Sequence, residues 1–452
     1  MLNAKRQLTF YRALSAGVKH YSFLKKPQLD VKFIIANLDK FEESIKKREL
    51  IQAPHLLNKL HELPLFYDRL RQIKQQINDI QKVRNQLESE VKNDKNRLPT
   101  LLQEIQKLKA QHKEKSEQLT RVSTEIAEIT TSLPNILHPS VPATTPQIVQ
   151  WLNRQQSSFL RNSESHVDIM TRKGMLDLQK AANTSGTSSY YLMNDGARLE
   201  QALINYCIDV VTKHGFAYVI PPSLTRLETI DSCGFRPRDM NGEKQIYSVG
   251  NEFGLVATSE ITLAAFYANE SITFKKNEYV KKIAGLSRCY RAEAGARGKD
   301  TKGLYRVHEF SKLEMFCWSI PDYADDVLEL LKDIQIEIIQ SLGLYAKVIN
   351  MPANDLGNPA SKKYDIEVWM PGRGQFGEVS SASNCTDFQS RRLNTKFRNE
   401  EKNYSYVYTL NGTAVAIPRI IIAIIENFYD ANSGKIHIPS CLRKYMADRE
   451  YI

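Results

Sequence analysis

The sequence lacks the motifs that mark several common chemistries. It contains no Walker-type glycine loop, no G-x-S-x-G elbow and no H-E-x-x-H pair. None of its six cysteines is spaced from another as C-x-x-C, and no histidine pair completes a zinc pattern. No apolar run reaches the ~18 residues that a membrane span needs, so we expect no membrane contact. Any phosphate binding must therefore come from arginines and helix ends.

Acidic residues are absent from Met1 to Leu29. Six lysines and arginines lie there among apolar and aromatic residues. Such an N-terminus is typical of a mitochondrial transit peptide, although a disordered basic tail has the same composition. We assign residues 1–27 to the transit peptide and expect the mature chain in the mitochondrial matrix. The scattered single cysteines fit a reducing compartment.

Length and charge narrow the class of protein. The 452 residues are enough for two or three domains, and 42% hydrophobic with 25% charged residues is typical of globular proteins. Lysine and arginine exceed aspartate and glutamate by 11. This excess favours an anionic partner such as nucleic acid, although a basic surface without a partner stays open.

Two long amphipathic stretches follow a short helical region at residues 30–60. Their apolar residues recur at three- and four-residue spacing, Asn93–Asn96 supply a turn, and Pro99 suits the first turn of the second helix. We predict an antiparallel coiled-coil arm over residues 64–133, roughly 45 Å long at ~1.5 Å per residue. Its many lysines and arginines would face solvent, a dimerisation partner or nucleic acid.

Four prolines between positions 134 and 146 end the arm and mark a linker. Beyond them short β-like runs alternate with helices, and aromatic residues become common. We therefore predict an N-terminal domain at residues 28–140 and a single α+β domain at residues 141–452.

Residues 286–318 are predicted to form a β-hairpin with a charged face. Arg291 and Glu293 precede a loop at Gly295–Gly303. Five residues after it occupy every second position and would share one strand face: Arg306, His308, Phe310, Lys312 and Glu314. Two arginines and a lysine suit phosphates, a glutamate can accept from an adenine amino group, and a phenylalanine offers a plate for a base. A solvent-exposed hairpin of mixed charges is the alternative.

Residues 409–429 place an arginine at the start of an apolar helix. Asn411-Gly412-Thr413 is a turn signal, Pro418 suits a first helical turn, and the isoleucines after it predict a buried helix. Arg419 is then a cation at the positive end of the helix dipole, which a bound anion would offset. A surface arginine at a loop–helix junction is the alternative.

Two shorter segments add polar groups. Thr258-Ser259-Glu260 places a hydroxyl and a carboxylate on one face of an extended segment, which suits a small zwitterion with an amine and a hydroxyl. Glu378 is followed by hydroxyls including Ser381, a set that could hold Mg²⁺ against phosphate oxygens. The end of a buried strand is the alternative for the second segment.

Together these segments resemble the motifs of class II aminoacyl-tRNA synthetases in their seryl form. Residues 286–318 resemble motif 2, residues 409–429 resemble motif 3, and residues 214–222 resemble motif 1, the dimer-interface element. Thr258–Glu260 is similar to the serine-binding T-x-E motif, and Ser381–Arg392 resembles a stretch typical of seryl enzymes. The arm matches the tRNA-binding arm of that family. The resemblance runs from position 28 to the end and is greatest with the fungal mitochondrial type.

The resemblance implies a fold, an activity and partners. The fold would be α+β: an N-terminal coiled-coil hairpin plus an antiparallel sheet of about six or seven strands flanked by helices. The activity would be that of a serine–tRNA ligase, which activates L-serine with ATP and Mg²⁺ and transfers it to mitochondrial tRNA-Ser. The enzyme would be a homodimer.

The resemblance also implies roles for matching positions. The catalytic set would be Arg291, Glu293 and Arg419. Arg291 would hold the ATP α-phosphate and the serine carboxylate, and Glu293 would bind the adenine amino group. The other ATP-binding positions would be Phe310 stacked on the ring, Arg306 and Arg419 on the outer phosphates, and Val307. Mg²⁺ and phosphate would be held by Glu378 and Ser381, and serine by Thr258, Glu260, Glu314 and Thr413.

Two positions depart from the commonest family pattern. Ile417-Pro418 stands where many relatives have Val-Gly, and Ala382 replaces a frequent cysteine, but neither removes a side chain assigned to chemistry. The alternatives are a catalytically inactive, synthetase-like RNA-binding paralogue, a synthetase for threonine or proline, and a structural coiled-coil protein. The retained arginines argue against the first, Ser383–Cys385 and the arm against the second, and the α+β domain against the third.

Overall fold

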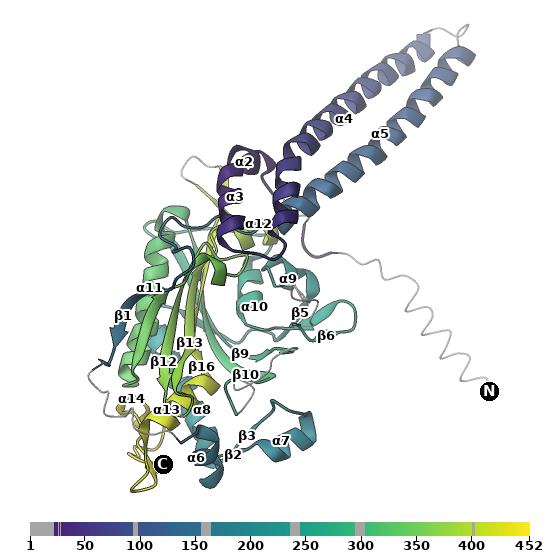
Figure 1. Cartoon of the computed structure of the whole chain (residues 1–452). Helices are drawn as coiled ribbons and strands as arrows, with labels where there is room; N and C mark the ends of the chain where they lie inside the picture. Colours follow the sequence, from purple (N-terminus) through teal and green to yellow (C-terminus); the bar gives the residue numbers. More distant parts are fainter. Residues whose placement is uncertain are drawn as a thin grey trace, which may run out of the picture.

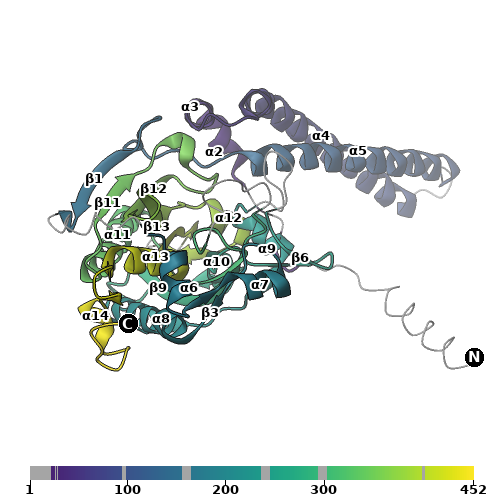
Figure 2. The ribbon, with the colours of Figure 1, turned by 60° about the horizontal axis from the view of Figure 1, so that its bottom comes forward.

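The computed structural model describes residues 22–25, 27, 29–93, 98–154, 164–235, 245–293, 303–399 and 403–452. Within them a helical N-terminal domain with a long arm is joined to a domain built on one large sheet (Figures 1 and 2). Most of the predicted transit peptide lies outside the described residues. No helix in the described part of the chain is long and apolar enough to cross a membrane.

Four helices form the N-terminal domain: α2 (Val31–Ala36), α3 (Leu38–Lys47), α4 (Ala53–Asn93) and α5 (Leu98–Ser132). The last two have 41 and 35 residues and pair antiparallel as the arm, which projects away from the sheet (Figure 1). Helix α4 begins at Ala53 instead of near position 64, and Pro64 lies inside it. The helix continues through this proline because Leu60 and Leu63, on the turn before it, are fully buried.

The core of the N-terminal domain lies at the base of the arm. Ile45 of α3 packs there with Leu60 and Leu63 of α4, and the two arm helices add Ile73, Val122, Ile126 and Ile129. Beyond this base α4 and α5 pack mainly on each other. The outer arm is therefore not needed to build the domain core.

The second domain contains an eight-stranded sheet in the order β1-β11-β12-β13-β16-β10-β9-β4. Neighbours run antiparallel from β1 to β9, whereas β4 runs parallel to β9. The antiparallel sheet predicted from the resemblance is confirmed, and β4 extends it at one edge. Its strands are β1 (Gln147–Leu152), β4 (Ala217–Val219), β9 (Val280–Tyr290), β10 (Glu309–Ser319), β11 (Ala346–Asn350), β12 (Lys362–Met370), β13 (Gln375–Asn384) and β16 (Tyr408–Ala416).

Helices cover both faces of this sheet. One face packs against α8 (Asn194–Lys213), α11 (Ala324–Ser341) and α13 (Ile417–Phe428), and the other against α10 (Glu260–Ala264) and α12 (Phe388–Leu393). Helix α9 (Leu227–Ser232) packs on α10 and α12. The other short elements are α6 (His166–Arg172), α7 (Leu178–Ser185), α14 (Ser440–Arg443), β2 (Leu176–Asp177), β3 (Tyr191–Leu192), β5 (Leu224–Arg226), β6 (Ser248–Val249), β7 (Phe253–Leu255), β8 (Ser271–Ile272), β14 (Lys396–Arg398), β15 (Tyr404–Tyr406), β17 (Tyr429–Asp430) and β18 (Lys435–Ile436).

Strand β10 separates the two apolar cores of the sheet domain. Leu313, Met315 and Cys317 belong to the first core, under α8, α11 and α13. Phe316 and Trp318 belong to the second core, on the opposite face. Because strand side chains alternate between faces, the polar residues that precede Phe316 at every second position lie on this second face. The polar site therefore lies between the sheet and α10.

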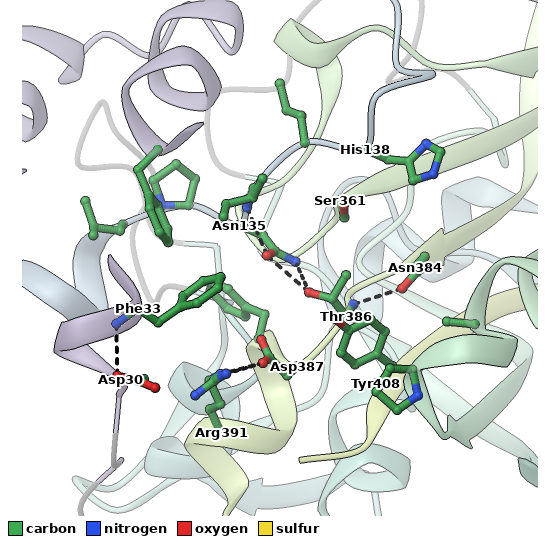
Figure 3. A pocket seen from close by; sticks show the side chains of 18 of the residues that line it. Asp30, Phe33, Asn135, His138, Ser361, Asn384, Thr386, Asp387, Arg391 and Tyr408 are labelled. Atoms are coloured by element: carbon green, nitrogen blue, oxygen red, sulfur yellow. Dashed lines mark hydrogen bonds and ion pairs between the residues drawn. The ribbon is translucent and has the colours of Figure 1, made fainter. Parts of the chain in front are cut away.

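Two polar side chains fix the base of the arm to the sheet domain. The buried guanidinium of Arg48 donates to the carbonyls of Leu356, Gly357, Asn135 and Ala360. Burial lowers the pKa of Arg48 to about 10, so it stays charged at neutral pH. The side-chain amide of Asn135 donates to the Thr386 hydroxyl at 2.9 Å (Figure 3). The arm therefore leaves the molecule from a defined place.

A cavity of about 360 Å³ lies beside this junction (Figure 3). Its lining comes from α2, the linker after α5 and α12, and includes Phe33, Tyr408 and the ion pair of Asp387 with Arg391. None of the site residues predicted from the sequence lines this cavity. The candidate active site lies elsewhere.

Candidate active site

Strands β9 and β10 form the predicted charged hairpin, with Phe310 opposite Cys289. The strand prediction was wrong for Arg306 and His308, which precede the start of β10 at Glu309. Beyond Glu309 one backbone bond still joins the two segments, from the Arg291 N–H to the His308 carbonyl at 2.9 Å, but the His308 N–H donates to the Ser188 carbonyl at 3.1 Å. Most of the predicted loop at Gly295–Gly303 lies outside the described residues.

The open end of the hairpin combines an apolar plate with charged groups. The guanidinium of Arg291 lies over the Phe310 ring, 5.3 Å from its centre. Arg306 donates from Nη1 to the Glu293 carboxylate at 3.0 Å. Val307 is buried beside Phe310. These groups suit a purine base with phosphates attached.

Deeper in the site a chain of buried polar groups crosses three segments. Lys312 donates from Nζ to the Thr258 hydroxyl at 2.6 Å and forms an ion pair with Glu314. Thr413 donates to Glu314 at 3.0 Å. The Asn411 amide then bridges to the Glu260 carboxylate at 3.1 Å. The arrangement presents two carboxylates, two hydroxyls and an ammonium group in one small volume.

Two local predictions for these residues were wrong. Glu260 is the first residue of helix α10, not part of an extended segment, because the Thr258 hydroxyl accepts from the Glu260 backbone N–H at 3.2 Å and starts the helix. Asn411–Thr413 lies within β16, not in a turn. Pairing with β10 and β13 on both sides overrides the turn preference of Asn-Gly.

The two buried carboxylates, Glu260 and Glu314, have different neighbours. Burial and the neighbouring Glu314 raise the pKa of Glu260 to about 7, against Lys312 and the Gln389 amide, which lower it. Gln389 donates to Glu260 at 2.7 Å from α12. Glu314 has Lys312 as its ion-pair partner. The carboxyl group of Glu260, with a pKa of about 7, therefore exchanges a proton near neutral pH.

Two β-bulges direct side chains into the site. Between β12 and β13 the register passes from Ile366 opposite Ser380 to Glu367 opposite Glu378, which leaves Val379 as the extra residue. Glu378 and Ser381, three positions apart, consequently share a face. A second register shift, at Ala414 of β16, places Thr413 opposite Glu314. No sequence pattern used above signals either bulge.

Arg419 lies in the first turn of α13, as predicted, next to Pro418. Its Nη1 donates to the Glu378 carbonyl at 2.8 Å, and its guanidinium lies 4.6 Å from the centre of the Tyr305 ring. Burial would raise the pKa of Glu378, but Lys363, Arg419 and Arg291 hold it below its usual value. An ionised carboxylate thus lies among cations at the mouth of the site.

All of the predicted site residues line one cavity of about 140 Å³: Thr258, Glu260, Arg291, Glu293, Arg306, Val307, Phe310, Glu314, Glu378, Ser381, Thr413 and Arg419. Sequence reasoning missed Asn411, Gln389 and Tyr305 as site residues. It grouped Lys312 with the phosphate-binding arginines, whereas Lys312 bonds to Thr258 and Glu314 in the buried part of the site. Asn411 and Gln389 lie inside the quoted motifs, so the motifs pointed to the right segments without giving these side chains a role.

A buried histidine joins motif 3 to the end of the motif 2 loop. The Leu304 backbone N–H donates to His166 Nε2 at 3.1 Å, so Nδ1 carries the proton and donates to Glu426 at 2.8 Å. Gly303 has a φ of +71°, and a Cβ there would lie 2.2 Å from His166 Nε2. Gly303 and Leu304 therefore lie against His166 of α6, which bonds in turn to Glu426 of α13, the helix that carries Arg419.

The antiparallel sheet, the arm of two long helices and a cavity lined by motif 2 and motif 3 residues define a class II aminoacyl-tRNA synthetase. Residues 246–428 match the model of the tRNA synthetase class II core domain (G, H, P, S and T), and residues 29–137 match that of the seryl-tRNA synthetase N-terminal domain. The chain belongs to the seryl-tRNA synthetase family, the serine–tRNA ligases.

Individual relatives agree along nearly the whole chain. The mitochondrial serine–tRNA ligase of Saccharomyces cerevisiae is 53% identical over 432 residues, covering 95% of this chain and 97% of the relative. That of Schizosaccharomyces pombe is 34% identical over 461 residues, covering 99% and 94%. A crystal structure of the Pyrococcus horikoshii seryl-tRNA synthetase complexed with ATP superimposes with a TM-score of 0.83 at 32% identity, covering 94% of this chain and 99% of that one.

Proposed function

We propose that the chain activates L-serine with ATP and then transfers the seryl group to the 3′ end of mitochondrial tRNA-Ser. The observation that carries the proposal is a single cavity in which a buried polar pocket adjoins three arginines. In the first step the serine carboxylate attacks the α-phosphorus and pyrophosphate leaves. In the second step the terminal ribose hydroxyl of the tRNA attacks the seryl carbonyl and AMP leaves.

The buried polar groups form the serine end of the site. Glu260 and Glu314 would accept from the ammonium and hydroxyl groups of serine, and Thr258 and Thr413 would complete the pocket. A site built around buried acceptors rejects an analogue without the hydroxyl, because those acceptors are then left unpaired. The pocket therefore favours serine over alanine.

The arginines form the nucleotide end. Arg291 would neutralise the α-phosphate and the serine carboxylate, while Arg306 and Arg419 would hold the outer phosphates. Phe310 would stack on adenine beside Val307, and Glu293 would accept from the adenine amino group. With no covalent nucleophile required, alignment and charge compensation by these side chains account for the rate.

Glu378 and Ser381 fit an Mg²⁺ ion that is shared with the phosphates. They share a face of β13, and the low pKa of Glu378 keeps its carboxylate ionised. Among the residues that the structure describes, no three His, Cys, Asp or Glu side chains gather as a metal site, so phosphate oxygens would complete the coordination. The ion would add positive charge where the phosphate charge develops.

The arm would bind tRNA, and a second copy of the chain would complete the enzyme. Lysines and arginines are frequent on both arm helices, which suits the phosphate backbone of tRNA.

At the edge of the sheet, in the motif 1 segment, Tyr218 is 37% and Ile220 79% exposed. Exposed apolar side chains beside an edge strand are typical of an interface, which supports a homodimer.

The mitochondrial matrix is the proposed location. The acid-free basic N-terminus supports it, as do the two fungal relatives that carry mitochondrial names. Residues 1–30 fused to a reporter should carry it into mitochondria, and a reporter that stays in the cytosol would contradict the proposal.

Pyrophosphate exchange with the purified protein tests the activity. Serine should support exchange, whereas alanine, threonine and proline should not. Exchange with threonine or proline would show a different synthetase, and no exchange with any amino acid by the folded protein would show the inactive paralogue. None of the comparisons supports that inactive alternative.

A further inference from the structure

Residues Ser22–Lys25, inside the predicted transit peptide, lie on the sheet domain. The Ser22 hydroxyl donates to the Glu228 carboxylate at 2.5 Å, and the Phe23 backbone N–H donates to the same carboxylate at 2.9 Å. Asn269 donates from its amide to the Phe23 carbonyl at 3.0 Å. Lys25 approaches the same amide from the other side, its N–H 3.5 Å from the Asn269 oxygen. Both backbone and side-chain groups of this segment thus form hydrogen bonds with residues of the sheet domain.

Leu24 adds an apolar contact to these polar ones. Its side chain is 9% exposed and belongs to the second core, together with Ile230, Ile261 and Ile272. The adjacent Phe23 is 53% exposed. The segment therefore packs on the domain through the side chain of Leu24 in one defined orientation, and not by non-specific apolar contact.

A docked segment conflicts with its removal after import. Cleavage at position 27 would uncover the site of Leu24 and leave Glu228 and Asn269 without these partners. Composition alone could not reveal this, because residues 22–25 are as free of acidic residues as those before them. We propose that processing cuts the chain before Ser22, so that the mature protein retains Ser22–Lys25 as an N-terminal clip. This inference rests on the proposed mitochondrial import.

The cleavage is the hydrolysis of one peptide bond by a processing peptidase. Water supplies the hydroxyl of the new carboxyl group on the released peptide and the hydrogen of the new amine on the mature chain. The product would begin at or upstream of Ser22.

The clip would also restrict the N-terminal domain. Only residues 26–30 separate Lys25 from α2, which begins at Val31. Lys25 and Val31 are six residue steps apart, so they lie at most roughly 22 Å from each other, since an extended chain advances ~3.3–3.6 Å per residue. With the clip in place, α2 is tied to the α9 side of the sheet domain, while Arg48 and Asn135 tie the base of the arm.

The position of the cut is tested on protein purified from mitochondria, by intact mass and N-terminal sequencing. An N-terminus between residue 2 and Ser22 supports the proposal. An N-terminus after Lys25, or an uncut chain inside mitochondria, overturns it. Absence of the protein from mitochondria overturns the proposed location instead, so the two failures are distinguishable.

The clip is tested separately with recombinant chains that begin at Ser22 or at Pro27. The chain starting at Ser22 should melt at the higher temperature, and Leu24→Ser should lower its melting temperature to that of the shorter chain. Phe23→Ser is the matched control, because that side chain is largely exposed, and it should melt like the parent. Equal melting of the two chain lengths would show that the segment contributes nothing and overturn the clip.

Discussion

Gln389 and Glu260 form a buried hydrogen bond of 2.7 Å between two helices on the site face of the sheet. Gln389 lies in α12 and Glu260 begins α10. The other carboxylate oxygen of Glu260 accepts from Asn411 at 3.1 Å. Burial and Glu314 raise the pKa of Glu260, and the Gln389 amide opposes them. Gln389 therefore holds Glu260 in place and favours its ionised form.

Replacement of Gln389 by methionine should move the pH dependence of serine use. Without its amide donor, the pKa of Glu260 should rise above about 7. Since kcat/KM reports the free enzyme, the acidic limb of kcat/KM for serine should shift to higher pH. Pyrophosphate exchange measured across pH at varied serine gives the profile. A lower activity at every pH with an unshifted limb would show that Gln389 serves only the packing of α12.

The parent enzyme should itself lose efficiency with serine in mild acid. The serine ammonium group prefers ionised Glu260, whose pKa is about 7, so kcat/KM for serine should fall about tenfold per pH unit below that value. Asp365, also buried, has its pKa raised to about 7. Glu260→Gln is therefore the necessary comparison: it should remove the limb if Glu260 is the titrating group. A limb that persists in this variant would show that another group titrates, and Asp365→Asn would then test Asp365.

Protonation of Glu260, which should lower kcat/KM for serine, should stabilise the folded protein. Its folded-state pKa lies above the unfolded value of about 4.3, so the folded protein keeps the proton that the unfolded chain releases. This contribution is fully present below about pH 4.3 and is lost as pH rises toward 7. Urea unfolding of the parent and of Glu260→Gln should show a difference in free energy that changes over this window and is constant above it.

Most side chains that line the site could be predicted from the sequence, because each motif specifies both the residue types and the spacing between them. The predicted residues converge on one cavity for that reason. Gln389 was missed as a site residue because its role depends on a contact between distant segments: it lies 129 positions from Glu260 in the sequence. Lys312 was assigned to phosphates because its bond to Thr258, 54 positions away, has no local signal. His166 has no signal at all in its own neighbourhood, since its partners come from Leu304 and Glu426.

Local conformation was less predictable where tertiary pairing decides it. Asn411-Gly412 favours a turn by itself, yet it lies in a strand with neighbours on both sides. The bulge at Val379 reverses the alternation of faces, and no local rule announces one extra residue. Pro418 and the isoleucines after it placed Arg419 correctly in the first turn of a helix, but no local pattern could supply its partners in Glu378 and Tyr305.

Shortening the arm should separate the two half-reactions. Replacing the whole predicted arm, residues 64–133, would remove Ile73, Val122 and Ile126 from the core at the base. Replacing residues 78–117 with a short flexible turn leaves those side chains in place. Serine-dependent pyrophosphate exchange should stay near the parent rate, whereas charging of tRNA-Ser should collapse because the phosphate contacts are lost.

A second variant keeps the full length of the arm but replaces the lysines and arginines beyond its base by glutamate. This variant should keep exchange and lose charging, most strongly at low salt, where phosphate contacts contribute most. An equal loss of exchange and charging in the shortened chain would show that the outer arm is a folding element.

Arg419→Ala tests the nucleotide end of the site. From the dipole alone, the variant would be as stable as the parent or slightly more so without ligand. The bonds of Arg419 to the Glu378 and Tyr305 carbonyls, at 2.8 and 3.3 Å, change that expectation, and we now expect a loss of about 1–2 kcal/mol. Exchange should fall by about 10²–10³, or ~2.7–4 kcal/mol, because outer-phosphate charge goes uncompensated.

Two further variants make the Arg419 result specific. Arg419→Lys should restore exchange only in part, since a point charge cannot replace the planar fork of a guanidinium. Arg373→Ala is the matched control, because the Arg373 guanidinium lies 3.5 Å from the centre of the same Tyr305 ring but does not line the cavity. It should keep exchange within a few-fold of the parent.

Melting curves with and without ATP complete the test: ATP should raise the melting temperature of Arg373→Ala but not of Arg419→Ala. Near-full exchange by Arg419→Ala, or a similar loss in both alanine variants, would show that Arg419 supports the Tyr305 segment and does not hold phosphate.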